Sequence, residues 1–341
     1  MVKRYPIYNK VYVIAIAMLL LSGKIYAQDT TYVDVLDFSE TNTVTWVNQI
    51  PTLKQDVRRS KKGWFKRLLL GENDLTTLQK PVSVIGMNLE NCIIFDQGNG
   101  SLFYAEGDKL EIPRFLRKKE TYFPSLVSAC LLPDKRILFT DSKLNKIFML
   151  SKDKKQITEL NKDLTLSQPT GIAYNKVTEQ VWVVETYKHQ INILDINGEH
   201  IKTIGQRGVI EGEFNFPTSI CIDKNGLAYI VDALNYRVQI FDADGNFISM
   251  FGENGNGTGF LASPKGIATD SYGNIYVVDA LFHGVQIFDA KGNYLYQFGK
   301  QGREPKEFWM PSGIFIDEKN HIYVADSYNA RIQIFELNYI Q

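Results

Sequence analysis

Acidic side chains recur at a fixed interval along the 341-residue chain, each at the end of an apolar run, and the interval is 47 residues across the last four copies. A ring of carboxylates is an arrangement that binds calcium or supplies acid and base groups. A simpler role exists, because Asp before a tight turn accepts hydrogen bonds from the backbone N–H groups of that turn, and every copy needs this equally. We expect the simpler role for Asp96, Asp141, Glu185, Asp232, Asp279 and Asp326.

Histidine is scarce, with four residues at His189, His200, His283 and His321. His189 and His283 each lie four residues after the repeated acid, in copies that are two apart. A metal site needs several converging donors. We therefore expect both histidines to be polar surface groups and predict neither a metal nor another cofactor. The alternative is a metal-dependent hydrolase or lyase with ligands drawn from Glu185, His189 and His283.

Composition narrows the function classes. The chain has 38 basic and 38 acidic side chains, so it offers no general case for binding nucleic acid. Its three cysteines, Cys92, Cys130 and Cys221, are odd in number and lie in apolar runs. We interpret them as buried residues rather than as a disulfide framework or a metal cluster.

The acids belong to a longer repeat that also carries a proline. Pro169, Pro217, Pro264 and Pro311 stand at spacings of 48, 47 and 47 residues, and weaker copies begin near residues 81 and 124. Each copy reads as four short strands: one after the proline, an apolar run such as 227–231, an alternating run such as 237–241, and a fourth after a turn pair. A period in the forties with four strands per copy predicts propeller blades around a channel.

The last copy makes the family resemblance specific. Its sequence Pro-Ser-Gly-Ile at 311–314, Ile-Tyr-Val-Ala-Asp at 322–326 and Ser-Tyr-Asn-Ala-Arg-Ile-Gln-Ile-Phe at 327–335 resembles the NHL repeat. The resemblance is strong over 169–337 and moderate over 81–168. It implies an all-β, six-bladed β-propeller of four-stranded antiparallel blades, of a kind found in secreted bacterial proteins. Departures occur at Glu185, at Phe282-His283-Gly284 and at Gly98-Asn99-Gly100.

Two enzyme families with related architecture supply a test of catalysis. Six-bladed lactonases hold a channel calcium with Glu, Asn and Asp, and amidating lyases with NHL repeats hold zinc with His just after the same proline. Neither ligand set is present at the positions after the proline, which the alignment assigns to Val82, Ser125, Thr170, Thr218, Lys265 and Ser312. The resemblance therefore does not extend to these active sites.

The sixth copy ends soon after its third strand, which would leave an open sheet edge. We expect an N-terminal strand at 43–49 to close this blade, with 32–38 as the alternative. A basic segment follows at 54–70, with apolar side chains at mostly helical spacing. It resembles an insert of some secreted NHL proteins, and it either plugs one mouth of the channel or presents a basic surface to an anionic partner or a membrane surface.

The first residues resemble a leader for export. A basic start precedes an apolar run at 11–21, which is too short to span a bilayer, and a small residue stands at Ala27. We predict a signal peptide at 1–27, an N-terminal segment at 28–80 and a propeller at 81–341, in a protein that is periplasmic or extracellular. An uncleaved membrane anchor is the alternative for the first segment.

The turns between the second and third strands differ from copy to copy, unlike the proline and the acid. Strand geometry places these turns on one face, where loops commonly carry function. We predict that this face, together with Lys265 near the channel mouth, binds a protein, peptide or polysaccharide of the cell envelope without catalysis. The alternative is that the aromatic residues pack over blade edges. The proposed binding residues are Tyr187, His189, Tyr236, Lys265, His283 and Tyr328.

Overall fold

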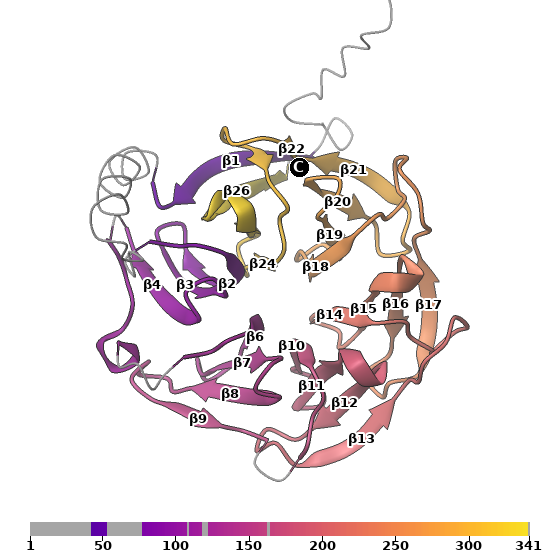
Figure 1. Ribbon diagram of the computed structural model, residues 1–341. Helices are drawn as coiled ribbons and strands as arrows, with labels where there is room; N and C mark the ends of the chain where they lie inside the picture. Colours follow the sequence, from indigo (N-terminus) through magenta and orange to yellow (C-terminus); the bar gives the residue numbers. More distant parts are fainter. Residues whose placement is uncertain (1–41, 53–76, 108, 118–121, 162–163, 340–341) are drawn as a thin grey trace, which may run out of the picture. The chain divides into compact units, whose positions relative to one another are not determined.

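The computed structural model describes residues 42–52, 77–107, 109–117, 122–161 and 164–339. In this part of the chain, the strands form six four-stranded sheets that stand as blades around a central opening (Figure 1). The predicted all-β, six-bladed propeller is confirmed. The leader predicted at 1–27, the alternative strand at 32–38 and the basic segment at 54–70 lie outside the described residues.

Blades 1 to 5 are each continuous in sequence and run from the innermost strand to the outermost one. Their strands are, for blade 1, β2 (Pro81–Asn88), β3 (Asn91–Asp96), β4 (Ser101–Glu106) and β5 (Lys109–Glu111); for blade 2, β6 (Leu126–Leu131), β7 (Ile137–Asp141), β8 (Lys146–Leu150) and β9 (Ile157–Glu159); for blade 3, β10 (Pro169–Asn175), β11 (Gln180–Glu185), β12 (Gln190–Leu194) and β13 (His200–Ile204); for blade 4, β14 (Pro217–Ile222), β15 (Ala228–Asp232), β16 (Arg237–Phe241) and β17 (Phe247–Phe251); and for blade 5, β18 (Pro264–Thr269), β19 (Ile275–Asp279), β20 (Gly284–Phe288) and β21 (Tyr294–Phe298).

Blade 6 combines the two ends of the propeller. It consists of β24 (Ile314–Ile316), β25 (His321–Asp326), β26 (Arg331–Tyr339) and β1 (Asn42–Ile50), in that order. β1 pairs antiparallel with β26 along its length. Side chains add to this pairing, because Arg331 Nη1 donates to Gln49 Oε1 at 2.9 Å and Trp46 Nε1 donates to Gln333 Oε1 at 3.1 Å. The fourth strand of the last blade therefore comes from the N-terminal side of the repeats.

Short elements connect the strands. A parallel pair, β22 (Lys300–Gln301) and β23 (Glu307–Phe308), lies in the linker before blade 6. One 3₁₀ turn, η1 (Arg114–Leu116), lies between blades 1 and 2. Three more join second and third strands of a blade, and these are η2 (Thr186–Lys188), η3 (Ala233–Asn235) and η4 (Ser327–Asn329).

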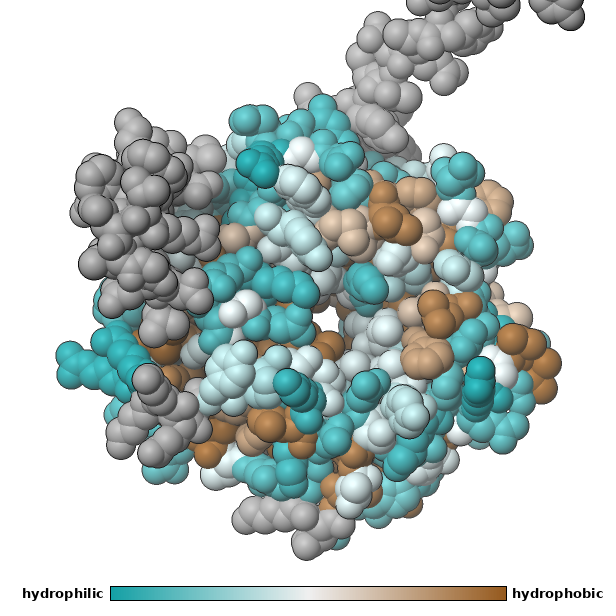
Figure 2. Space-filling view, in the orientation of Figure 1, coloured by the Kyte–Doolittle hydropathy of each residue, from teal (hydrophilic) through white to brown (hydrophobic). Residues whose placement is uncertain are grey.

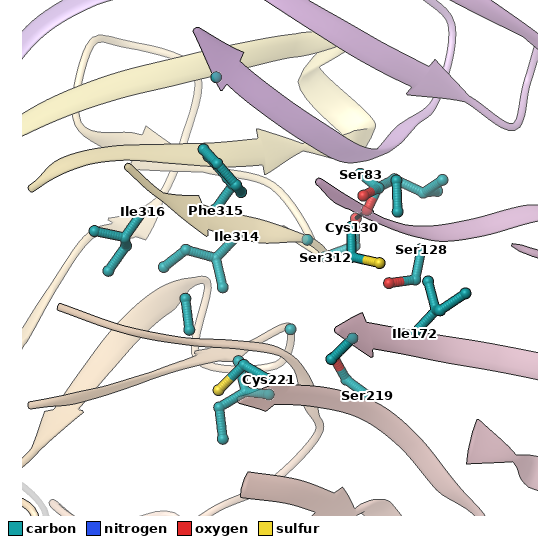
Figure 3. Close-up of a pocket in the computed structure, with 18 of the residues that line it drawn as sticks. Ser83, Ser128, Cys130, Ile172, Ser219, Cys221, Ser312, Ile314, Phe315 and Ile316 are labelled. Atoms are coloured by element: carbon teal, nitrogen blue, oxygen red, sulfur yellow. Dashed lines mark hydrogen bonds between the residues drawn. The ribbon is translucent and has the colours of Figure 1, made fainter. Parts of the chain in front are cut away.

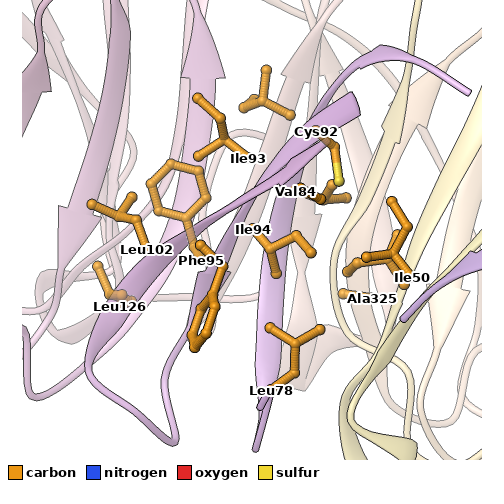
Figure 4. Close-up of a cluster of buried hydrophobic side chains, with 14 of the residues drawn as sticks. Ile50, Leu78, Val84, Cys92, Ile93, Ile94, Phe95, Leu102, Leu126 and Ala325 are labelled. Carbon is orange, nitrogen blue, oxygen red and sulfur yellow. The ribbon is translucent and has the colours of Figure 1, made fainter. Parts of the chain in front are cut away.

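The strand sequences match their depth in the blade. Every residue of the second strands β15 and β19 is buried, and both are rich in β-branched and aromatic residues that pack well on a pleated sheet. The outermost strand β17 alternates instead, with Ile248 and Met250 exposed. Apolar contacts continue across blades, as Figure 4 shows for Ile50 and Ala325 of blade 6 next to Val84 of blade 1.

Glycine near the start of the innermost strand lets neighbouring blades approach. A Cβ added at Gly313 would lie 2.3 Å from Val82 O, and one at Gly171 would lie 2.8 Å from Ile220 N. Both contacts are too short for any side chain. The glycine of the Pro-x-Gly pattern is thus required by close packing around the channel and not by catalysis.

The register corrects one sequence alignment. In blade 1, Pro81 pairs with the repeated acid Asp96, and in blade 2 the residue paired with Asp141 is Leu126. In this copy the position that pairs with the acid is occupied by leucine instead of proline, and Pro124 lies two residues before it. The residue that corresponds to Val82 is therefore Val127, and the assignment of Ser125 to this position was wrong.

Each second strand ends at the face where the innermost strand begins, since the two are antiparallel. The turns between second and third strands therefore share one face, which we call the turn face, and it includes residues 97–100, 142–145, 186–189, 233–236, 280–283 and 327–330. The linkers between blades also start and end there. The other turns form the opposite face.

Candidate functional site

The six repeated acids are buried beneath the turn face and bind backbone N–H groups. Each is at most 1% exposed. Asp279, for example, accepts hydrogen bonds from Ala262 N at 2.7 Å and from Leu281 N at 3.0 Å, so it joins the linker before its blade to the turn after its strand. Burial raises the pKa of the Asp96 and Asp326 carboxyls, and hydrogen bonds from nearby N–H groups oppose that rise. The predicted capping of the following turn is confirmed for three acids, Asp96, Asp141 and Asp279. The other three, Glu185, Asp232 and Asp326, accept instead from backbone N–H groups of the preceding linker.

Arginine strengthens this arrangement in blades 4 and 6. Arg237 Nε lies 2.8 Å from Asp232 Oδ2, and both side chains are buried. The same guanidinium donates to the carbonyl oxygens of Val209, Ile210 and Glu213 in the preceding linker. Arg331 repeats the contact with Asp326 at 2.8 Å. The turn face therefore rests on a layer of charge-assisted hydrogen bonds that fixes its backbone.

Large apolar side chains project from this fixed backbone. Five of the six turns carry one near their tip, with exposed fractions between 41% and 63%. The sixth turn has Gly98 two residues after its acid. We call this set the apolar ring, and it consists of Leu144, Tyr187, Leu234, Leu281 and Tyr328. Val209 and Ile210 in the linker before blade 4 are exposed on the same face.

Figure 2 shows the ring of blades open at its centre, with separate hydrophobic clusters standing among hydrophilic side chains. When a partner covers apolar side chains that are exposed to water, the free energy of the system falls. Exposed apolar clusters of this kind are therefore typical of contact surfaces.

The structure separates the predicted binding residues into three positions. Tyr187 and Tyr328 lie at equivalent places in the apolar ring. Lys265 is exposed and lines the central channel one residue after Pro264. The remaining three, His189, Tyr236 and His283, occupy another shared position, the last residue of the turn, where the backbone is left-handed with φ of 56°, 55° and 53°.

Both histidines at this last position bind the next blade. His189 is 7% exposed, and its Nδ1 accepts a hydrogen bond from Phe216 N at 3.0 Å. His283 Nδ1 accepts from Met310 N at 3.1 Å. Burial lowers the pKa of both imidazoles, which favours the neutral ring that such an acceptor requires. The expectation that these rings are polar surface groups fails for His189.

Tyr236 is half-buried and packs against a cluster of buried apolar residues formed by blades 4 and 5. Sequence reasoning grouped it with Tyr187 because both are turn tyrosines. It missed Leu144, since that residue stands three rather than two positions after the acid. It named the turns that hold Leu234 and Leu281 but did not propose either residue, although their exposed apolar character was the available signal.

The side chains that the sequence offered as metal ligands have other hydrogen-bond and ion-pair partners. Glu185 is buried, accepts hydrogen bonds from Ser167 N and Asn192 Nδ2, and pairs with Lys188 at 2.8 Å. Within the described ranges, no three His, Cys, Asp or Glu side chains gather as metal ligands. The arrangement around Glu185 and His189 is one of structural hydrogen bonds.

The central channel has a volume of about 1050 Å³ and is lined by all six innermost strands. Figure 3 shows serine hydroxyls on its wall at Ser83, Ser128 and Ser219, with Cys221 and Phe315 elsewhere on the wall.

Cys130 and Cys221 are only partly buried, whereas Cys92 is buried. The expectation that all three cysteines are buried is thus wrong for two of them.

No described helix is long and apolar enough to cross a membrane.

A family model described as "NHL repeat" matches residues 214–241, and one described as "6-bladed beta-propeller" matches residues 269–341. No curated protein matches the sequence.

Solved structures share the fold at low sequence identity. A Bacteroides thetaiotaomicron protein of unknown function is 14% identical with a TM-score of 0.61, and 77% of this chain aligns with 70% of that one. An auxiliary nutrient binding protein of the same organism is 13% identical with a TM-score of 0.59, over the same shares of the two chains. Virginiamycin B lyase from Staphylococcus aureus is 14% identical with a TM-score of 0.55, over 77% of this chain and 96% of that one. With its six described blades and these matches, the chain is a six-bladed β-propeller of the NHL-repeat type.

Proposed function

We propose that the protein is an exported, non-enzymatic scaffold that holds a protein or peptide of the cell envelope on its turn face. The observation that carries this proposal is the apolar ring. In five of the six blades, the turn between the second and third strands exposes one large apolar side chain to water. Tyrosine is enriched among the residues that dominate the binding free energy of protein interfaces, and exposed leucine adds apolar area that a partner can cover. The leader predicted at 1–27 supports export.

The contrast between fixed and variable positions supports a binding role. The buried acid is present in every blade, and it holds the preceding linker or the following turn through backbone hydrogen bonds. The exposed residue changes between Leu and Tyr and is replaced by Gly98 in blade 1. A rigid backbone lowers the entropy lost on binding, and varied side chains on it provide specificity.

A polysaccharide is the alternative partner, because Tyr187 and Tyr328 offer flat, exposed faces. The leucines Leu234 and Leu281 favour a protein or peptide, since an aliphatic side chain has no flat ring for a sugar to stack on. Fold similarity to a nutrient binding protein and to a lyase does not choose between functions, because one fold hosts many.

The test replaces four ring residues together, Tyr187→Ser, Leu234→Ser, Leu281→Ser and Tyr328→Ser. Each is at least half exposed, so each change should alter the free energy of unfolding by no more than about 0.5 kcal/mol. Loss of two anchors worth about 2 kcal/mol each would weaken partner binding by roughly a thousandfold. Partner recovery from an envelope extract, by mass spectrometry and by glycan analysis, is the measurement.

The matched control removes exposed apolar groups from the opposite face, with Met87→Ser, Val177→Ser and Tyr272→Ser. We expect the control to recover the same partner as the unmodified protein. Equal recovery by the ring variant and the unmodified protein would refute the proposal. Recovery of a glycan instead of a protein would select the alternative partner.

A further inference from the structure

The central channel has an excess of positive charge that the chain as a whole lacks. Among the residues that the structure describes, six lysines line it, Lys80, Lys135, Lys154, Lys176, Lys265 and Lys319, against two acids, Asp317 and Glu318. The full sequence has equal numbers of basic and acidic side chains. The excess therefore belongs to the channel and favours an anion inside it.

Four of these lysines gather where the channel opens on the opposite face, and we call this opening the lysine mouth. Lys135, Lys176 and Lys319 are exposed in turns that follow innermost strands, and Lys154 reaches the edge from blade 2, with its Nζ 3.0 Å from Met87 Sδ. Burial lowers the pKa of Lys154.

The two acids of the lysine mouth have partners nearby. Asp317 Oδ2 lies 2.7 Å from His321 Nδ1, and Glu318 lies 3.8 Å from Lys176. Lys135, Lys154 and Lys319 have no carboxylate within 4 Å among the described residues. These three ammonium groups can therefore pair with an external anion without breaking an ion pair.

The wall next to the lysine mouth is mostly apolar and faces the channel. Cys221, Ile222, Phe315 and Ile316 line it and are only partly buried, so water is their present neighbour. The hydroxyls of Ser83, Ser128 and Ser219 come earlier in their strands, nearer the turn face. A molecule entering from the lysine mouth thus meets charge first, apolar wall next and hydroxyls last.

The dimensions suit a linear molecule. The seven residues of β10 span about 20 Å at about 3.3 Å per residue. The volume of about 1050 Å³ lies slightly above the range of about 300–1000 Å³ that is typical of small-molecule sites.

We propose that the channel is a binding site for a linear amphiphilic anion. The anionic head lies among the ammonium groups of the lysine mouth, and the apolar body lies against Ile222, Phe315 and Ile316. Binding covers apolar wall that water now contacts and neutralises the excess charge, and both changes favour association. The channel meets the apolar ring at Tyr328, but the lysine mouth and the apolar wall beside it lie toward the opposite face, so the site adds a second ligand class to the scaffold.

Calorimetric titration with decanoate tests the charge preference, with decyltrimethylammonium as a cation of the same chain length. We expect decanoate to bind one molecule per protein and the cation to bind at least about tenfold more weakly. Raised ionic strength should weaken decanoate binding. Equal affinities for the two amphiphiles would overturn the proposal.

Charge variants identify the mouth. Lys135→Gln with Lys319→Gln should weaken decanoate binding about tenfold, because both side chains are exposed and lack carboxylate partners. The control, Lys152→Gln with Lys291→Gln, removes two exposed lysines of the same face that do not line the channel, and it should bind decanoate normally. An equal loss in both double variants would contradict a specific site.

The two wall cysteines report occupancy. Cys130 and Cys221 line the channel, whereas Cys92 is buried in the core and does not. Burial raises the pKa of both thiols, so their modification by methyl methanethiosulfonate is followed at about pH 9, where more thiolate is present. Saturating decanoate should slow this modification at least about threefold, read by mass spectrometry, and leave Cys92 unchanged. Binding without protection of Cys130 and Cys221 would place the site outside the channel and refute the proposal. A ring variant that keeps the channel-lining Tyr328, with Tyr187→Ser, Leu234→Ser and Leu281→Ser, should still bind decanoate, so the two proposals fail independently.

Discussion

The two faces of the propeller use the same carboxylate chemistry to different effect. On the turn face, Asp232 is fully buried and accepts hydrogen bonds from Asn215 N, 17 residues away, and from the Arg237 guanidinium. On the opposite face, Asp242 is more exposed and accepts only from its own turn, at Asp244 N and Asn246 N. The Asp232 carboxylate therefore joins distant segments, whereas the Asp242 carboxylate joins only its own turn. Blades of the opposite face are linked by amide side chains instead, as where Ser271 N donates to Asn320 Oδ1 at 2.9 Å.

This difference explains why the exposed residues of the turn face can vary between blades. Its backbone does not depend on the exposed residues, because the buried acids and Arg237 or Arg331 already fix it. Exposed positions there can change without loss of the fold.

The largest expected effect is loss of a buried acid. Asp232→Ala leaves Arg237 buried without its carboxylate and should lower the free energy of unfolding by about 3–5 kcal/mol. Asp242→Ala removes only local bonds and should cost about 1 kcal/mol. Urea unfolding of both variants measures the difference. Equal losses would show that the two faces are held alike.

The histidines of the turn face give an intermediate effect that depends on pH. Burial lowers the pKa of His189 and His283, so their stabilising contribution is full above about pH 6.5, the ordinary value, and is lost as the pH falls from there through the lowered pKa. His189→Asn with His283→Asn keeps an acceptor and tolerates the left-handed backbone.

Urea midpoints of this double variant and the unmodified protein should agree at about pH 7.5. The variant should lose less stability than the unmodified protein between about pH 6.5 and pH 5. A parallel decline of the two proteins would mean that these rings do not accept hydrogen bonds in the neutral form.

The smallest expected effect comes from a difference between blades. Thr170 Oγ1 lies 2.7 Å from Thr186 Oγ1, and Ser312 repeats this with Ser327. In blade 4 the turn residue is Ala233, and Thr218 Oγ1 is buried with no partner among the described residues. Ala233→Ser should supply the missing bond and raise the unfolding free energy by about 0.5–1 kcal/mol. A lower urea midpoint would contradict this.

The repeated features were predictable from sequence because every copy repeats the same physical requirement. The recurring proline and acid predicted the order of the strands in each blade, and the acid also predicted hydrogen bonds to nearby backbone N–H groups. Where a copy lacked its marker, as at Leu126, the alignment slipped by two residues.

Features that depend on contacts between blades were not predictable. His189 and Tyr187 are two residues apart in one turn, yet only His189 meets the next linker, at Phe216. The lysine mouth consists of turns from blades 2, 3 and 6. These turns are far apart in the sequence, so the sequence alone did not indicate that they lie close together.

The most direct test of the account asks which face touches the partner in the cell. A photo-crosslinking phenylalanine analogue is placed at position 187 or 328 on the turn face, and at position 272 on the opposite face, each replacing an exposed tyrosine. We predict crosslinks to one envelope protein from positions 187 and 328 and none from position 272. Crosslinks from position 272 alone, with none from the turn face, would contradict the account.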